Sequence, residues 1–519
     1  MNSRILDLTS RFSKYTLLTI SLLFIATYIV AVFLRIRYPF ELVVMEGGVL
    51  DHVRRVLLGK SLYVSPSLDF APYIYAPLYY YVSAPMAKLM GVEFMPLRLV
   101  SFVSSLGSFL IIFLIVKRET KSNFPAILAS SLFSATFAIS GFYFDVARID
   151  SLFLFFLVAG IYFIRTEASR KSYILAGICI SLSFLTKQIA MIIAFPLAIY
   201  AIYSNRRLSL FFLGTIVVTA GTSTLFLHLI SDQWYLYYVF DLPQQHGIVK
   251  WLFIQFWLKD IMLQMPVASI LAVFYLFTQR TVSSRCILDV SIAAGMLGSG
   301  LLSRMHWGGH LNTLFPAYAL ISIFFGLATH RCLKLIQSKH AHQKMLMEIG
   351  IYLICIIQFS CLMYNPFSGV PTRKDLEAGK KIVETISEIE GDVFFTSFPS
   401  LSYMAAMAGK RGFASYVPIF DVVRGDKGRV REELVNEIRK AIEDRRFSAI
   451  IHQGRWFLMS NREMRKYYEK HRPVFEDKNV FFAVDVEPHK VRPDIYIPRR
   501  RDREGGEKHE RGVRSGREG

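Results

Sequence analysis

The sequence predicts a polytopic α-helical membrane protein with about eleven transmembrane helices and a small C-terminal α/β domain. The chain has 519 residues, of which 53% are hydrophobic, and it contains 43 phenylalanines. These side chains are concentrated between residues 15 and 365, in successive apolar runs close to the ~20 residues that a helix needs to cross a bilayer. From residue 366 onward the composition is that of an ordinary soluble protein.

The apolar runs give the expected elements in order. The first run is long and has no small-residue cleavage site before LRIRYPFELVV, so we expect it to remain as a span rather than be removed as a signal peptide. The predicted spans are 15–36, 97–116, 123–143, 150–164, 172–186, 189–204, 209–230, 261–278, 287–303, 311–328 and 346–364.

Lysine and arginine in the short loops predict the orientation. With eleven spans and a cytoplasmic N-terminus, the inner loops include KRETKS, RTEASRKS and HRCLKLIQSKHAHQK, which are basic. This places the protein in the inner or plasma membrane with an extracytoplasmic C-terminal domain. The segment 76–91 has a short apolar core with Pro85 and Lys88, so we expect a helix along the outer surface rather than a twelfth span.

The predicted domains follow from these assignments. Residues 1–365 form the membrane domain, with a first outer loop at 37–96, and residues 366–498 form the outer domain. In the latter, DLEAGKKIVETISEIEG and REELVNEIRKAIEDRR are expected helices, whereas DVFFTSF, FSAIIHQ and NVFFAVDV are expected strands. The basic tail 499–519 is poor in apolar residues and is predicted to be disordered.

Charge and cysteine content exclude some classes of function. The net charge is +20, but the basic residues lie in short loops and in the tail, without interleaved stacking aromatics. We therefore expect no nucleic-acid partner. The five cysteines show no CxxC or His-Cys zinc spacing, and none falls in a predicted outer segment, so no structural disulfide is expected there.

Ionisable residues gather at the outer ends of the spans. Charged groups at membrane depth are costly and are usually functional. The candidates are Glu46, Asp51, Asp145, Arg148, Asp150, Lys187, Gln188, Arg304, His310 and Asn312.

Five motifs in order resemble those of the GT-C glycosyltransferases, in the branch with aminoarabinose transferases and protein O-mannosyltransferase-like enzymes. They are Glu46-Gly47 followed by GKSLY at 59–63, YAPLYYY at 75–81 with PLRL at 96–99, DVARIDSL at 145–152, TKQ at 186–188 and GGHLN at 308–312. The resemblance covers residues 15–365. Two positions depart from it: the family often has Asp-Glu where this chain has Met45-Glu46, and Pro-Pro-Leu where it has Ala76-Pro77-Leu78.

The resemblance implies transfer of a sugar from a polyprenyl-phosphate donor to an extracytoplasmic acceptor, which is a lipid, a glycan or a protein. Glu46 is the expected general base, with Asp51 able to share that role, and Asp150 is expected to bind sugar hydroxyls or orient a cation. The donor phosphate and sugar would be bound by Arg148, Lys187, Asp145, Gln188, Arg304, His310 and Asn312. The resemblance leaves open whether a divalent cation is bound, because carboxylates alone do not select one.

Structural alternatives exist for each group. Glu46 could begin an amphipathic helix, Arg148 and Asp150 could pair at a helix start, and Lys187 could extend to the interface without binding substrate. His310 could be an ordinary interfacial residue. For the whole chain, the alternative is a lipid or solute flippase or transporter, although such proteins often place charges near the midplane and carry inverted repeats, and the sequence has no clear repeat.

Overall fold

The computed structural model describes residues 3–166, 168–279, 283–396, 402–454, 456–476 and 492–500. Within these residues the chain forms two compact units. The first is built from residues up to 64 and from 74–371, and the second from residues 65–73 and from the described residues after 371. The predicted strand NVFFAVDV and nearly all of the basic tail lie outside the described residues.

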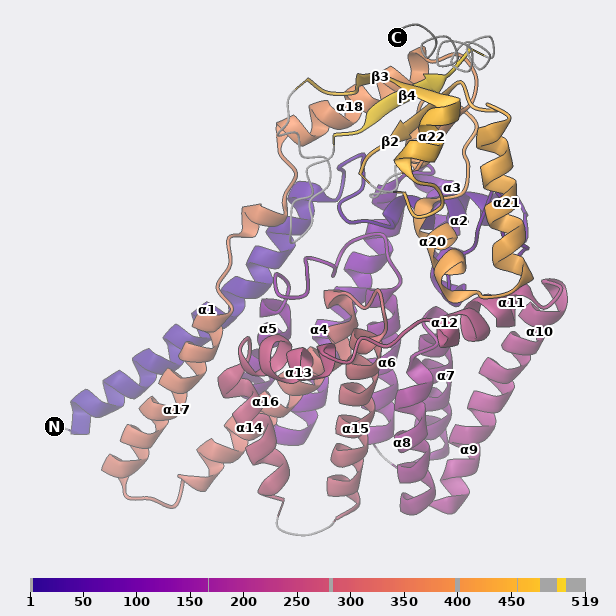
Figure 1. The fold of residues 1–519 in the computed structure, drawn as a ribbon. Helices are drawn as coiled ribbons and strands as arrows, with labels where there is room; N and C mark the ends of the chain where they lie inside the picture. Colours follow the sequence, from indigo (N-terminus) through magenta and orange to yellow (C-terminus); the bar gives the residue numbers. More distant parts are fainter. Residues whose placement is uncertain are drawn as a thin grey trace, which may run out of the picture. The chain divides into compact units, whose positions relative to one another are not determined.

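The first unit is helical (Figure 1). Its α-helices are α1 (Ser3–Arg35), α2 (Glu46–Leu57), α3 (Leu78–Met90), α4 (Phe94–Thr120), α5 (Asn123–Ala135), α6 (Asp150–Arg165), α7 (Arg170–Thr186), α8 (Ala190–Ser204), α9 (Arg206–Ile216), α10 (Thr222–Ile230), α11 (Trp234–Leu236), α12 (Leu242–Gln245), α13 (Leu252–Gln255), α14 (Pro266–Phe277), α15 (Ser284–Met305), α16 (Phe315–Leu335) and α17 (Ala341–Cys361). Short π- and 3-10 segments complete it: η1 (Val217–Gly221), η2 (Tyr237–Asp241), η3 (Phe256–Met262), η4 (Leu311–Leu314) and η5 (Pro366–Gly369).

Six helical stretches among the described residues are long and apolar enough to cross a membrane. They are Arg4–Arg35, Phe94–Thr120, Arg206–Ile230, Ser284–Met305, Leu311–Leu335 and Ala341–Cys361. The helix pair Leu252–Met262 and Pro266–Phe277 also passes when taken together, with a 97° bend. The multi-pass membrane architecture is therefore confirmed, whereas the number of spans stays a prediction. At 13 residues, α3 is too short to cross by itself.

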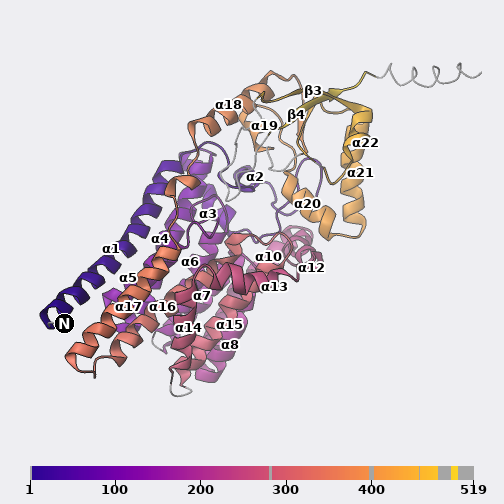
Figure 2. The ribbon, with the colours of Figure 1, turned by 60° about the vertical axis from the view of Figure 1, so that its left-hand side comes forward.

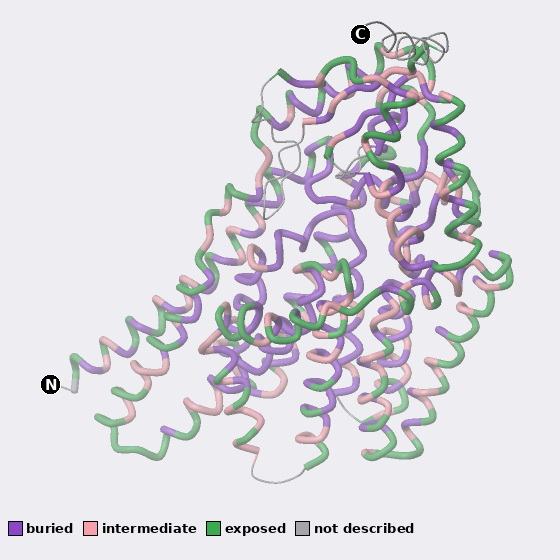
Figure 3. The backbone as a smooth tube through the Cα atoms, viewed as in Figure 1, coloured by how far each residue is buried: buried purple, intermediate pink, exposed green. Residues whose placement is uncertain are grey.

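Helices pack closely at the centre of the bundle. Helix α16 is almost wholly buried, and at Gly326 an added Cβ would lie 2.7 Å from the Pro125 carbonyl of α5. The two outlying helices α1 and α17 lie side by side (Figures 1 and 2) and keep many side chains exposed (Figure 3), as expected for surfaces that face lipid.

One predicted span differs from the structure. Instead of a helix over 123–143, α5 ends at Ala135, and residues 136–149 form an irregular, buried segment. Gly141 in this segment has φ +73°, a conformation that suits glycine. Irregular backbone at membrane depth is tolerated where protein buries it. This segment, which hydropathy alone does not distinguish from helix, carries Asp145 and Arg148.

The second unit confirms the predicted small α/β region. A four-stranded sheet has the order β1-β2-β4-β3, with β1 and β2 parallel and β4 antiparallel to its neighbours. Its elements are α18 (Arg373–Glu388), β1 (Val393–Phe395), α19 (Tyr403–Met407), α20 (Tyr416–Gly425), α21 (Arg429–Glu443), β2 (Ala449–His452), α22 (Asn461–Tyr467), β3 (Tyr468–Pro473) and β4 (Asp494–Pro498). Capping boxes begin α18 and α22, at Thr372 and Ser460.

Candidate active site

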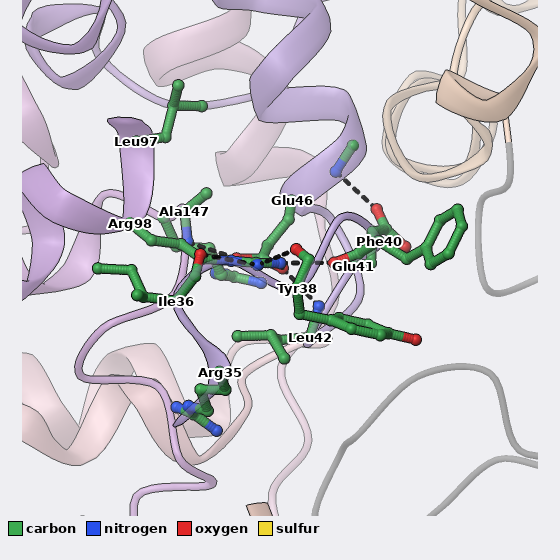
Figure 4. Close-up of polar contacts among 12 residues, drawn as sticks. Arg35, Ile36, Tyr38, Phe40, Glu41, Leu42, Glu46, Leu97, Arg98 and Ala147 are labelled. Carbon is green, nitrogen blue, oxygen red and sulfur yellow. Dashed lines mark hydrogen bonds and ion pairs between the residues drawn. The ribbon is translucent and has the colours of Figure 1, made fainter. Parts of the chain in front are cut away.

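Glu46 is fully buried at the first residue of α2 and forms an ion pair with Arg98 of α4 (Figure 4). Arg98 donates from Nε to Oε1 (2.9 Å) and from a terminal nitrogen to Oε2 (2.7 Å). The backbone N–H of Ala147 donates to Oε1 (2.6 Å) and that of Leu42 to Oε2 (2.5 Å). Each carboxylate oxygen therefore accepts two hydrogen bonds.

The electrostatics of Glu46 follow from these contacts. Burial by itself would raise the pKa of Glu46, but the charge of Arg98 and the four hydrogen bonds outweigh it and hold that pKa below its ordinary value. Arg98 also donates to the carbonyls of Tyr38 and Phe40, both at 2.6 Å. We call Glu46, Arg98 and the backbone groups that they contact the clamp, because they hold the loop before α2 in place. The assignment of Glu46 as general base stays a prediction.

A second buried cluster lies next to the clamp, and we call it the Asp150 cluster. Lys187 Nζ donates to Asp150 Oδ1 (2.8 Å), and Arg148 Nε donates to Asp150 Oδ2 (3.3 Å). The side chains of Asp150, Arg148 and Lys187 are only 1%, 8% and 11% exposed. Asn312 also lies within reach of the carboxylate. The structure thus brings together four predicted residues from three distant segments, and two cations face one carboxylate.

The clamp and the Asp150 cluster share two stretches of backbone. The backbone N–H that donates to Glu46 belongs to Ala147, the residue directly before Arg148. Arg148 in turn contacts the Val44 carbonyl (3.3 Å) and the Met45 sulfur (3.0 Å). Met45 has φ +88°, in the left-handed region that non-glycine residues rarely adopt. Glu46 therefore holds the backbone directly before Arg148. Glu46 and Arg98 together hold the loop that the Arg148 side chain contacts.

Tyr143 contacts both His310 and Arg148 of the Asp150 cluster. The guanidinium carbon of Arg148 is 5.2 Å from the centre of the Tyr143 ring, and the His310 ring lies 5.7 Å from the same ring.

Gln188 lies beside Lys187 in sequence, and its amide donates to the carbonyls of Ile74 (2.7 Å) and Val239 (3.0 Å). It therefore ties α7–α8 to the segment before α3.

Two other predicted ligands form ion pairs of their own. Asp145 is fully buried and pairs with Arg35, which also donates to the carbonyls of Phe142 and Gly369. Arg304 pairs with Asp260 at 2.8 Å and donates to the Gly309 carbonyl. Both pairs join segments of the first unit, and nothing in their contacts requires a ligand.

Asp51 is the partly exposed carboxylate of α2. Its side chain is 27% exposed and pairs with Arg54 at 2.8 Å. Loss of hydration raises the pKa of Asp51 to about 6, even though Arg54 acts in the opposite direction. Beside it, burial lowers the pKa of His52 to about 4, so that imidazole is neutral at physiological pH. Asp51 is therefore ionised at neutral pH and close enough to its pKa to accept a proton.

Some structurally important residues are absent from the sequence-based predictions. Arg98 and Arg35 pair with carboxylates 52 and 110 positions away, and Asp260 pairs with Arg304. A charged residue within or at the end of an apolar run was the available signal for both arginines. Among the described residues, no group of three or more His, Cys, Asp or Glu side chains is arranged to hold a metal ion.

Part of the chain matches a known protein family. Residues 74–239 match the family model described as dolichyl-phosphate-mannose-protein mannosyltransferase. This range contains α3, the Asp150 cluster apart from Asn312, and Gln188. A comparison with curated proteins finds no match.

The fold is similar to those of two solved membrane proteins. ArnT from Cupriavidus metallidurans, solved in the apo state and bound to undecaprenyl phosphate, matches with a TM-score of 0.58 and 11% identity over 92% of this chain and 97% of that chain. AglB, the archaeal oligosaccharyltransferase from Archaeoglobus fulgidus, solved with an inhibitory peptide and a dolichol-phosphate, matches with a TM-score of 0.50 and 11% identity over 85% and 69%. At this identity the likeness concerns the fold. Together with the family match over residues 74–239, the likeness in fold agrees with the resemblance to GT-C glycosyltransferases seen in the sequence.

Proposed function

We propose that the protein transfers a sugar from a polyprenyl-phosphate donor to an acceptor on the extracytoplasmic side of the membrane. The observation that carries this proposal is the charge of the Asp150 cluster. Arg148 and Lys187 converge on the carboxylate of Asp150 in a site with little exposed surface. Two neighbouring cations of this kind can each form a charge-assisted hydrogen bond to a phosphate oxygen. The phosphate of a lipid-linked donor would accept these hydrogen bonds.

The cluster suits the chemistry of the transfer. An acceptor oxygen attacks the anomeric carbon, the bond from that carbon to the phosphate oxygen breaks, and the polyprenyl phosphate leaves with the electron pair. Lys187 and Arg148 would stabilise the negative charge of the leaving phosphate, and exclusion of water would strengthen that effect. Asp150 would hold both cations in position and accept hydrogen bonds from sugar hydroxyls. Gln188, His310, Asn312 and Arg304 are the remaining proposed donor contacts.

The proton of an acceptor hydroxyl needs a base, and we assign that role to Asp51 rather than Glu46. All four hydrogen-bonding positions of Glu46 are taken, and its side chain has no exposed surface. Asp51 is partly exposed and has a pKa of about 6. A base works best when its pKa lies near the working pH. Glu46 then acts as a positioning residue for Arg148.

The comparisons support the lipid donor by analogy. The ArnT structure contains undecaprenyl phosphate and the AglB structure contains a dolichol-phosphate. Both lipids present a phosphate on a polyisoprenoid chain. The identity of the sugar and of the acceptor stays outside this proposal.

Binding of undecaprenyl phosphate to purified protein tests the proposal directly. Lys187→Ala removes a charge-assisted contact to phosphate, which is worth about 1.5–3 kcal/mol, so we expect affinity to fall by ~10-fold or more. Lys187→Arg should retain most of the binding. Lys88→Ala, at an exposed lysine of α3, serves as a matched control. If Lys187→Ala binds the lipid as tightly as the parent while its thermal unfolding is unchanged, the phosphate is bound elsewhere and the proposal fails.

A further inference from the structure

A groove of about 310 Å³ lies between the C-terminal end of α2, α3 and the end of α10. Its walls combine aromatic, apolar and polar side chains, with Lys60, Ser61, Tyr63, Tyr81, Leu227 and Ile230 as the main members. None of the residues of the Asp150 cluster lines it. The groove is therefore distinct from the proposed donor phosphate site, and it lies entirely within the first unit.

Exposed apolar side chains lie around the groove. Ile230 is the last residue of the spanning stretch Arg206–Ile230, in which only 17% of the most apolar window is buried (Figure 3). Around the groove, Leu58 and Leu229 are each 68% exposed and Ile230 is 55% exposed. Exposed apolar side chains at the end of a span lie where acyl chains meet head groups. A ligand of this groove can therefore enter sideways from the bilayer.

The loop 59–63 presents one cation at this boundary. Lys60 is exposed, and no ion pair to its ammonium group is found among the described residues. Arg55 donates to the Ser61 carbonyl (2.5 Å), and the Tyr63 hydroxyl donates to the Tyr75 carbonyl (2.7 Å), so the loop is tied on both sides of the lysine. An exposed lysine on a tethered loop, beside the apolar residues of the groove, suits a molecule with one negative charge and an acyl tail.

We propose that this groove binds an anionic phospholipid of the leaflet at this end of α10. The lipid phosphate would lie at Lys60, the hydroxyl of Tyr81 would donate to a head-group oxygen, and the first acyl carbons would lie along Leu227 and Ile230. A lysine near an anionic membrane surface contributes roughly 1 kcal/mol of attraction, and a direct contact to phosphate contributes more. Because the groove has one cation and takes a short apolar segment, a bilayer phospholipid fits it better than a long polyprenyl chain. This inference does not depend on the proposed donor.

Lipid retention by the full-length protein tests the proposal. The protein is reconstituted in nanodiscs of mixed phosphatidylglycerol and phosphatidylcholine, extracted in mild detergent and weighed with its bound lipids by native mass spectrometry. We expect the parent and Lys88→Ala to retain phosphatidylglycerol in preference to phosphatidylcholine. Lys60→Ala should lose that preference by about ten-fold, the change that corresponds to a lost charge-assisted contact.

Two outcomes would overturn the inference. Equal retention of phosphatidylglycerol by Lys60→Ala and the parent would show that Lys60 binds no head group. The second outcome is that undecaprenyl phosphate displaces the retained phospholipid, and that Lys60→Ala weakens this displacement whereas Lys187→Ala does not. That result would assign the groove to the donor instead. Thermal unfolding of Lys60→Ala, an exposed position, should match that of the parent and so exclude misfolding as the cause.

Discussion

At the scale of single residues, the structure separates two neighbouring carboxylates by their surroundings. Glu46 is enclosed by Arg98 and two backbone N–H groups, whereas Asp51, five positions later on α2, is partly exposed. The pKa of Glu46 lies below its ordinary value and that of Asp51 is about 6. We therefore propose a structural role for Glu46 and proton exchange for Asp51.

The pH dependence of transfer should report on Asp51. Its carboxylate is the active form, so we expect the rate to rise with pH through a midpoint near 6 and to level off above it. Asp51→Asn should lower transfer by ~10²–10⁴-fold and remove this midpoint. Rates measured between pH 5 and 8 with saturating donor check the prediction. A normal profile in Asp51→Asn would reject Asp51 as the base.

Replacement of Glu46 should reduce the stability of the folded protein. Glu46→Gln leaves Arg98 buried without its counter-charge, so we expect the free energy of unfolding to fall by about 3–5 kcal/mol. The double variant Glu46→Gln/Arg98→Met should recover part of this loss, since neither charge is then left unpaired. Thermal unfolding in detergent measures both. If Glu46→Gln is as stable as the parent but loses transfer entirely, Glu46 is the base after all.

At the scale of elements, α6 joins two buried ion clusters. Asp150 begins it, and Arg165 ends it beside Asp289 of α15, which also accepts from Tyr275 and Gln279, both at 2.9 Å. Because Arg165 and Asp289 are 4% and 0% exposed, Asp289→Asn should destabilise the bundle by several kcal/mol. Binding of undecaprenyl phosphate by the folded fraction should stay within about two-fold of the parent. A large loss of binding there would show that the two ends of α6 are coupled.

Element by element, the long spans could be predicted and the irregular segments could not. The runs at Arg4–Arg35 and Phe94–Thr120 are long enough for hydropathy to identify them. The residues directly after Ala135 are mostly apolar, so hydropathy extends the predicted span to residue 143, and Gly141 is a local sign that the helix ends earlier. Asp150 and Lys187 were expected at one site because their motifs occur in family order. Their mutual contact and the role of Arg98 depend on packing between distant segments, which periodicity does not encode.

At the scale of the whole molecule, the basic inner loops predict which side of the membrane each segment faces. In a cysteine-free background, Lys427→Cys should react with an impermeant thiol reagent in intact cells, and Ser338→Cys should react only after the cells are opened. Both positions are exposed in the structure. Labelling of Ser338→Cys with protection of Lys427→Cys would reverse the orientation and remove Asp51 from the outer side.

We propose that the chain catalyses sugar transfer from a lipid phosphate rather than moving a lipid or solute across the bilayer. Transfer needs no second compartment, so the most direct measurement uses purified protein in detergent, with radiolabelled polyprenyl-phosphate sugars and an extract of acceptors from the native membrane. We predict that the donor is consumed and a glycosylated product appears, and that Lys187→Ala reduces both. Failure to turn over any such donor in detergent, together with movement of a lipid or solute across sealed vesicles by the same preparation, would refute sugar transfer and identify a transporter.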